Sequence, residues 1–179
     1  MHFSQILSIL GSAAVVAATN TVTFISLDGT DRTVYFTPSA GHEQVETITV
    51  KGGDKVVSEI PQGWIGNWHS ISDGKENTPG MLGEVAFQGW NGFTYFDVSA
   101  IVDPTDHDGV KEMYPASSNA PTSGCETFPC NNAYYVWDDV QTKVTPETDI
   151  ICTLGSGVSP LVAAEAPAAV KRNFVEGKF

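Results

Sequence analysis

The sequence predicts a mainly β protein, built as an antiparallel β-sandwich with long loops. From Asn20 to Ser70, apolar and polar residues alternate with the period of two that places one face of a strand against a core. Turn-forming residues interrupt this alternation at intervals of roughly ten residues, which is typical of sandwiches and barrels. No segment after residue 18 shows an apolar stripe at the helical period over three turns.

The expected strands follow one another along the chain. Four are centred on Val22/Phe24, Val34/Phe36, Ile48/Val50 and the run from Val56 to Ile60. Residues 82–88 and 93–98 form a further pair, and Trp90-Asn91-Gly92 between them predicts a hairpin turn. The chain after Pro104, through residues 105–124, is expected to be a loop because it is rich in turn residues and lacks periodicity. Late strands are expected at residues 133–137 and 149–154.

Three regions differ in composition. Residues 1–18 have an apolar run that ends in small residues, which predicts a cleaved signal peptide and secretion. Residues 19–154 are the length of one domain. Residues 155–179 are rich in Ala, Pro, Ser and Gly and predict a disordered tail. Within that tail, the pair Lys171-Arg172 is either a processing site or a solvated charged pair.

The net charge excludes two classes of partner. The chain has 9 Lys and Arg residues against 21 Asp and Glu residues, a formal charge of −12. Such a surface repels nucleic acid phosphates and anionic membranes, and neither is expected as a partner. We expect a secreted monomer, located outside the cell or in the cell wall.

The cysteines are Cys125, Cys130 and Cys152. In an oxidising compartment two of these three residues should pair and one should remain. The spacing does not decide which two form the disulfide.

Three segments resemble the thaumatin-like proteins, in that family's order. They are NTVTFISLDGTDRTVYFTP, LGEVAFQGWNGFTYFDVSAIVD and CNNAYYVWDDVQTKVTPETDIIC. The chain departs from the family in being short, in lacking most of the family's cysteines and in having no clear counterpart of the arginine in its cleft. The resemblance is therefore to a small, fungal-type member that lacks most of the disulfide-rich second lobe.

The resemblance implies an acidic cleft that binds cell-wall β-1,3-glucan, with weak endo-β-1,3-glucanase activity as a further possibility. It places Glu84, Asp97, Asp103 and one of Asp138 and Asp139 in that cleft. Hydrolysis of a glycoside needs one protonated and one ionised carboxyl. Glu84 would be the acid, and Asp97 or Asp103 would be the base.

Aromatic residues near these carboxyls can stack on sugar rings. Trp90, Tyr95 and Tyr114 are the candidates for substrate binding, together with Asp138 and Asp139. Burial in the core would explain about half of the chain's aromatic residues equally well.

Two other hypotheses concern metals. Asp103, Asp106 and Asp108 place several oxygen ligands within six residues, which could hold calcium, although their spacing does not match the usual calcium loop and a solvated acidic loop explains them too. No other cofactor is expected. A metal-dependent nuclease using His69 or His107 is a minor alternative that the acidic charge disfavours.

The main competing hypothesis is a non-catalytic secreted protein, such as a host-directed effector, that keeps the sandwich but has lost the chemistry of the cleft. The absence of a cleft arginine favours this alternative.

Overall fold

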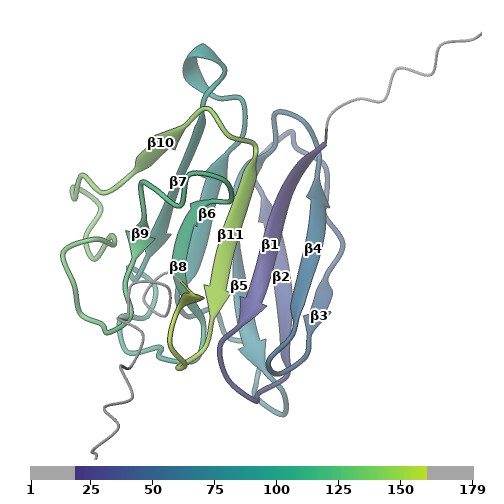
Figure 1. Ribbon diagram of the computed structural model, residues 1–179, viewed down its shortest axis with the longest axis vertical. Coiled ribbons are helices and arrows are strands. Elements are labelled where there is room, and N and C mark those ends of the chain that lie inside the picture. Colours follow the sequence, from purple (N-terminus) through teal and green to yellow (C-terminus); the bar gives the residue numbers. More distant parts are fainter. Residues whose placement is uncertain (1–18, 161–179) are drawn as a thin grey trace, which may run out of the picture.

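The computed structural model describes residues 19–160 and confirms the mainly β sandwich. The expected signal peptide, residues 1–18, and most of the expected tail, residues 161–179, lie outside the described residues. Two sheets pack face to face, with the five-stranded sheet in front of the six-stranded sheet in the view of Figure 1. Within residues 19–160, no helix has the length and apolar character needed to cross a membrane.

The five-stranded sheet has the order β4-β1-β11-β8-β9. Its strands are β1 (Asn20–Ser26), β4 (Lys55–Ile60), β8 (Val110–Pro115), β9 (Ser123–Gly124) and β11 (Asp149–Leu154). Strands β1 and β11 are parallel, so the first and last strands of the domain lie side by side. The other pairs in this sheet are antiparallel.

The six-stranded sheet has the order β10-β7-β6-β5-β2-β3 and is antiparallel throughout. Its strands are β2 (Arg32–Pro38), β3 (Ile48–Val50), β5 (Ile65–Ser72), β6 (Leu82–Ala86), β7 (Thr94–Ser99) and β10 (Lys143–Thr145). The predicted hairpin is confirmed: β6 pairs with β7, and a 3₁₀ turn, η1 (Trp90–Gly92), joins them.

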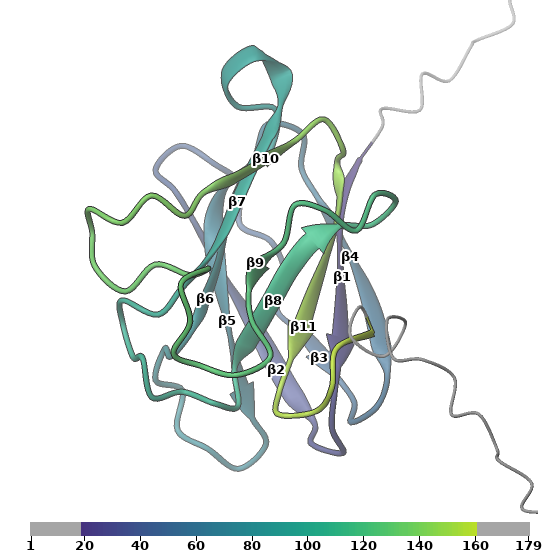
Figure 2. The same ribbon diagram turned by 60° about the vertical axis from the view of Figure 1, so that its left-hand side comes forward.

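Two of the sequence-based assignments are wrong. The segment expected to be loop contains β8, whose residues are all buried, so burial on both faces hides the alternation that marks a strand. Residues 133–137 form no strand and contribute only an isolated bridge between Tyr134 and Ser99. The long loops that follow β7 and β9 lie together on one side of the sandwich (Figure 2).

The core between the sheets is centred on Trp68, which is fully buried. Its ring lies edge-on to Phe24 of the opposite sheet, with ring centroids 5.6 Å apart. Its indole Nε1 donates to the Cys152 sulfur at 3.4 Å. Cys152 is the unpaired cysteine, and burial raises its pKa to about 12, so this thiol is an inert part of the core.

The other two cysteines, Cys125 and Cys130, form a disulfide. The disulfide closes a short loop after β9 and leaves the core strands without a covalent link. The sandwich is therefore held by burial and hydrogen bonds.

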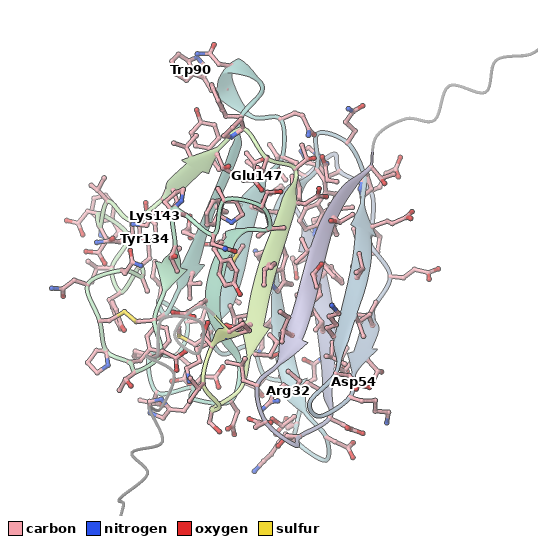
Figure 3. All side chains as sticks on the ribbon, in the orientation of Figure 1. Arg32, Asp54, Trp90, Tyr134, Lys143 and Glu147 are labelled. Carbon is pink, nitrogen blue, oxygen red and sulfur yellow. A yellow bond between two sulfur atoms is a disulfide. The ribbon has the colours of Figure 1, made fainter. Side chains whose placement is uncertain are left out.

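One buried ion pair closes an end of the sandwich. Arg32 at the start of β2 is 1% exposed, and it donates to both carboxylate oxygens of Asp28 at 2.8 Å. Its Nε also donates to the Asp108 carbonyl at 2.7 Å, and Asp28 accepts the Ser156 amide at 2.9 Å. The β1–β2 turn, the loop before β8 and the segment after β11 are thus tied to one guanidinium. Figure 3 places Arg32 at the opposite end of the sandwich from Trp90.

The C-terminal part of the described chain packs on the same end. A Cβ on Gly155 would lie 2.3 Å from Asp28 Oδ2, so only glycine fits there. Ser159 is fully buried, and its amide donates to the carboxylate of Glu126. Residues 155–160 therefore pack against the sandwich.

Replacing Gly83 with Ala tests the packing of the core. The new Cβ would lie 2.5 Å from Trp68 Nε1 and 2.9 Å from Met113 Sδ, so we expect the free energy of unfolding to fall by about 1–3 kcal/mol. Urea denaturation measures this change. Gly29→Ala is the matched control because nothing lies within 4 Å of its new Cβ, and equal losses for the two variants would contradict the packing described here.

Replacing Asp28 with Asn tests the ion pair. The Arg32 hydrogen bonds hold the pKa of Asp28 far below its usual range, with further help from the Ser156 and Thr30 amides. The pair therefore stabilises the fold above about pH 4 and loses its contribution as the pH falls through the folded pKa. At pH 7 we expect Asp28→Asn to cost about 3–5 kcal/mol, because it leaves a buried guanidinium without its anion.

Thermal unfolding of wild type and Asp28→Asn between pH 2 and pH 7 checks this prediction. The two melting temperatures should converge as the pH falls. Asp31→Asn, which removes the exposed partner of Lys51, should have a much smaller effect. A difference in melting temperature that stays constant from pH 2 to pH 7 would show that the charge of Asp28 does not cause the loss of stability.

Candidate functional site

A row of polar side chains crosses the outer face of the six-stranded sheet. Asn67 on β5 pairs in register with Glu84 on β6, which pairs with Asp97 on β7. Their sequence neighbours Val85 and Phe96 belong to the core, so strand alternation turns the polar row away from it. Strand pairing therefore brings together two carboxyls that lie 13 residues apart in the chain.

The row forms part of the floor of an open groove with a volume of about 300 Å³. This volume is at the small end of the range for ligand sites. The lining combines polar and apolar groups from three strands and two loops: Ser39, Ile65, Gly66, Asn67, Glu84, Val85, Ala86, Tyr95, Asp97 and Thr142.

Asp97 is the most constrained of these side chains. It is 8% exposed, and its Oδ2 accepts a hydrogen bond from the Thr142 hydroxyl at 3.2 Å. Thr142 in turn lies 2.8 Å from the Tyr134 hydroxyl. The other oxygen, Asp97 Oδ1, is buried and has no hydrogen-bond partner among the described residues.

The environment favours the protonated form of Asp97. Burial, followed by the negative charge of Glu84, raises the pKa of Asp97 to about 7. The Thr142 hydrogen bond and the charge of Lys143 act in the opposite direction and lower this pKa. Below about pH 7 the Asp97 carboxyl therefore holds a proton.

Strand pairing places the two carboxyls side by side on one face of the sheet. A glycosidase places its two carboxyls on either side of the scissile bond, about 5 Å or more apart, to leave room for the sugar carbon or a water. The Glu84–Asp97 pair is instead a pair of neighbouring acids, of which Asp97 favours its protonated form.

Tyr95 and Trp90 flank one end of the groove. Tyr95 is half-buried and lines the groove, and its hydroxyl lies 3.3 Å from the Trp90 carbonyl. Trp90 is 77% exposed at the tip of η1, which projects beyond the sandwich (Figure 3). The turn therefore presents Trp90 to solvent, as its position in the sequence suggests.

The remaining predicted site residues do not join this groove. Asp103 lies in the loop after β7 and lines a separate depression beside residues 70–80. Asp139 accepts hydrogen bonds from the Tyr135 and Val136 amides, and Asp138 is exposed in the same loop. Tyr114 is 1% exposed in the five-stranded sheet, so its ring is not available to a ligand.

The aspartates expected to bind calcium instead hold their own loop. Asp106 accepts the amides of Asp108 and Gly109 with Oδ1 and that of Met81 with Oδ2. Asp103 Oδ1 accepts both the amide and the hydroxyl of Thr105. Residues 19–160 contain no group of three or more His, Cys, Asp or Glu side chains arranged to hold a metal, so the calcium hypothesis is not supported.

Sequence reasoning missed two groups that shape the groove. Asn67 belongs to β5, which was not assigned as a separate strand, although its alternation would have placed Asn67 on the outer face. Thr142 reaches Asp97 because β10 pairs with β7, and no local signal marks that contact.

Comparison with known proteins identifies the family. No family model matches the chain. The antigenic protein SchS21 of Stachybotrys chartarum is 57% identical over 140 residues, which cover 78% of this chain and 97% of the relative. This chain belongs to the SchS21 family.

A solved structure supports the fold of this SchS21-family chain. The crystal structure of the protein elicitor MoHrip2 from Magnaporthe oryzae matches with a TM-score of 0.56 over 75% of this chain and 98% of the other. The sequence identity is 13%, so this likeness concerns the fold alone.

The thaumatin-like resemblance is therefore wrong. It depended on short runs such as Glu-Val-Ala-Phe and Phe-Asp-Val-Ser, in which polar residues alternate with apolar ones. Any hairpin with one buried face produces such runs. The SchS21 relationship, at 57% identity, replaces it.

Replacing Glu84 with Gln tests the coupling of the two carboxyls. We expect the pKa of Asp97 to fall, yet to stay above its ordinary value because burial remains. Because the folded pKa of Asp97 lies above the unfolded value of about 3.9, its contribution to stability is complete below pH 4 and is lost as the pH rises through 7. Carboxyl ¹³C NMR and urea denaturation between pH 4 and pH 8 measure both effects.

The matched control is Glu59→Gln on β4 in the other sheet. It removes the same charge and should leave the titration of Asp97 unchanged. An unaltered Asp97 pKa in Glu84→Gln would contradict the coupling.

Proposed function

We propose that this protein is a secreted, non-catalytic recognition protein that binds cell-wall carbohydrate in the Glu84–Asp97 groove. The observation that carries the proposal is the groove itself. It is open, lies on a rigid sheet, and combines paired carboxyls with an aromatic ring. Carboxylate, amide and hydroxyl groups exchange hydrogen bonds with sugar hydroxyls, and Tyr95 offers a ring face for stacking.

The geometry favours binding over hydrolysis. Glu84 and Asp97 are cross-strand neighbours on one face of the sheet, whereas a glycosidase places its two carboxyls on either side of the scissile bond.

Secretion is supported by the apolar N-terminal segment, which ends in small residues, and by the Cys125–Cys130 disulfide, which is stable in an oxidising compartment. The relative SchS21 is named as antigenic and MoHrip2 as an elicitor, and both words describe proteins that another organism detects. A protein secreted by one organism and met by another fits the host-directed alternative.

Sedimentation with insoluble β-1,3-glucan, cellulose and chitin tests the proposal, with reducing-sugar release measured in the same tubes. We expect retention on at least one polymer without sugar release above a protein-free blank. Tyr95→Ala should weaken retention about three- to tenfold through the lost stacking.

Val57→Ala, which trims an exposed apolar side chain on the other sheet, is the control and should bind as wild type does. Retention that is unaffected by Tyr95→Ala would show that the polymer binds outside the groove. Sugar release by wild type that is lost in Glu84→Gln would show that the groove is catalytic and would overturn the non-catalytic proposal.

A further inference from the structure

We propose that the natural ligand of the Glu84–Asp97 groove carries a protonated amino group, as chains of β-linked glucosamine do. This inference rests on the proposed carbohydrate-binding function and specifies the ligand. It follows from the charge and the unused hydrogen-bonding capacity of the groove.

The charge of the groove is not balanced by the protein. Ion pairs among residues 19–160 join Arg32 to Asp28, Lys51 to Asp31 and Lys111 to Glu126, and none reaches Glu84 or Asp97. Lys143 on β10 acts on Asp97 only at longer range. Two adjacent carboxyls without a cation repel each other, so a bound cation would gain free energy at this position.

The hydrogen bonds point to the same ligand. Asp97 Oδ2 is occupied by Thr142, whereas the buried Oδ1 has no donor among the described residues. A buried acceptor without a donor is costly. An ammonium group, with three donors and a positive charge, can serve Asp97 Oδ1 and the Glu84 carboxylate together.

Glu84 brings the ligand next to Asp97. The Glu84 side chain is half-buried and lines the open groove, so an ammonium beside it lies next to Asp97, its cross-strand partner. The ammonium then takes the place of the proton on Asp97, which is released to solvent. The titratable groups around Asp97 are Glu84 on β6, Lys143 on β10 and the phenols of Tyr95 and Tyr134.

The rest of the groove favours a sugar ring over a bare amine. Asn67, Ser39 and Thr142 offer an amide and two hydroxyls around the carboxyl pair, and Tyr95 offers an aromatic face. A linear polyamine would use the carboxyls alone. An amino sugar would use both the charge and the polar lining.

Isothermal titration calorimetry at pH 6 and 150 mM salt tests the proposal on the protein secreted from the full-length chain. The probes are tetramers of β-1,4-glucosamine, β-1,4-N-acetylglucosamine and β-1,3-glucose, with spermidine as an amine without a ring. We expect the glucosamine tetramer to bind at least tenfold more tightly than the other three. Glu84→Gln should weaken its binding about 10- to 100-fold, the loss typical of a charged hydrogen bond.

Glu59→Gln is the matched control, since it removes an equal charge from the other sheet and should change the affinity less than twofold. Equal losses of affinity in Glu84→Gln and Glu59→Gln would show that the acidic protein attracts the cation without a specific site. That result would overturn the proposed site. Titration in two buffers of different ionisation enthalpy adds a second readout: wild type should release a proton on binding the glucosamine tetramer, and Glu84→Gln should not.

The probes separate the two proposals. The neutral tetramers could bind as tightly as the glucosamine tetramer or more tightly, with an affinity that Tyr95→Ala weakens. This result would uphold carbohydrate binding and overturn the amino-group inference. Spermidine binding as tightly as the glucosamine tetramer would overturn the preference for an amino sugar. Binding of no probe would overturn both proposals.

Discussion

The buried guanidinium of Arg32 is the constraint on which one end of this sandwich depends. A charge that is 99% removed from solvent is tolerated only if it is paired and its donors are used, and here Asp28, the Ser26 hydroxyl and the Thr30 and Asp108 carbonyls use them. These acceptors come from the β1–β2 turn and the loop before β8, and Asp28 also holds the segment after β11. Local sequence places Asp28 and Arg32 four residues apart, but only the closed sandwich supplies the other partners. The ion pair therefore links the turn between β1 and β2 to the loop before β8 and to the segment after β11, beside the parallel β1–β11 pairing.

The Glu84–Asp97 groove shows the opposite use of charge. Arg32 is paired with Asp28, whereas on the outer face of β6 and β7 two carboxyls lie side by side and neither forms an ion pair within residues 19–160. The antiparallel register imposes this proximity, because Val85 and Phe96 must both face the core. The fold tolerates the pair because burial and the neighbouring negative charge favour a proton on Asp97. The buried ion pair and the candidate site thus lie in different parts of the sandwich.

The failure of the thaumatin-like resemblance has a physical cause. Short strands with one buried face restrict composition so strongly that unrelated sandwiches share runs of four or five residues. Family membership needs agreement over the whole domain, which the 57% identity to SchS21 provides and the quoted runs did not. The same limit applies to the candidate site. The resemblance placed Glu84 and Asp97 in one cleft, and strand register does bring these two together, whereas Asp103, Asp138 and Asp139, which it also offered, lie elsewhere.

The sequence by itself determined the mainly β class, the β6–β7 hairpin and the exposure of Trp90, because alternation and an Asn-Gly turn are local signals. Alternation also sufficed to bring Glu84 and Asp97 together once the hairpin was assigned. The tertiary structure alone decided that β8 is a strand, since a segment buried on both faces carries no alternation, and that Tyr114 is enclosed within it. It also decided the Thr142 contact, the Cys125–Cys130 pairing and the partners of Arg32. The Thr142 contact follows from β10–β7 pairing and the partners of Arg32 follow from the closure of the two sheets, and no local pattern encodes either. The Cys125–Cys130 bridge is local, but the spacing of the three cysteines does not select it.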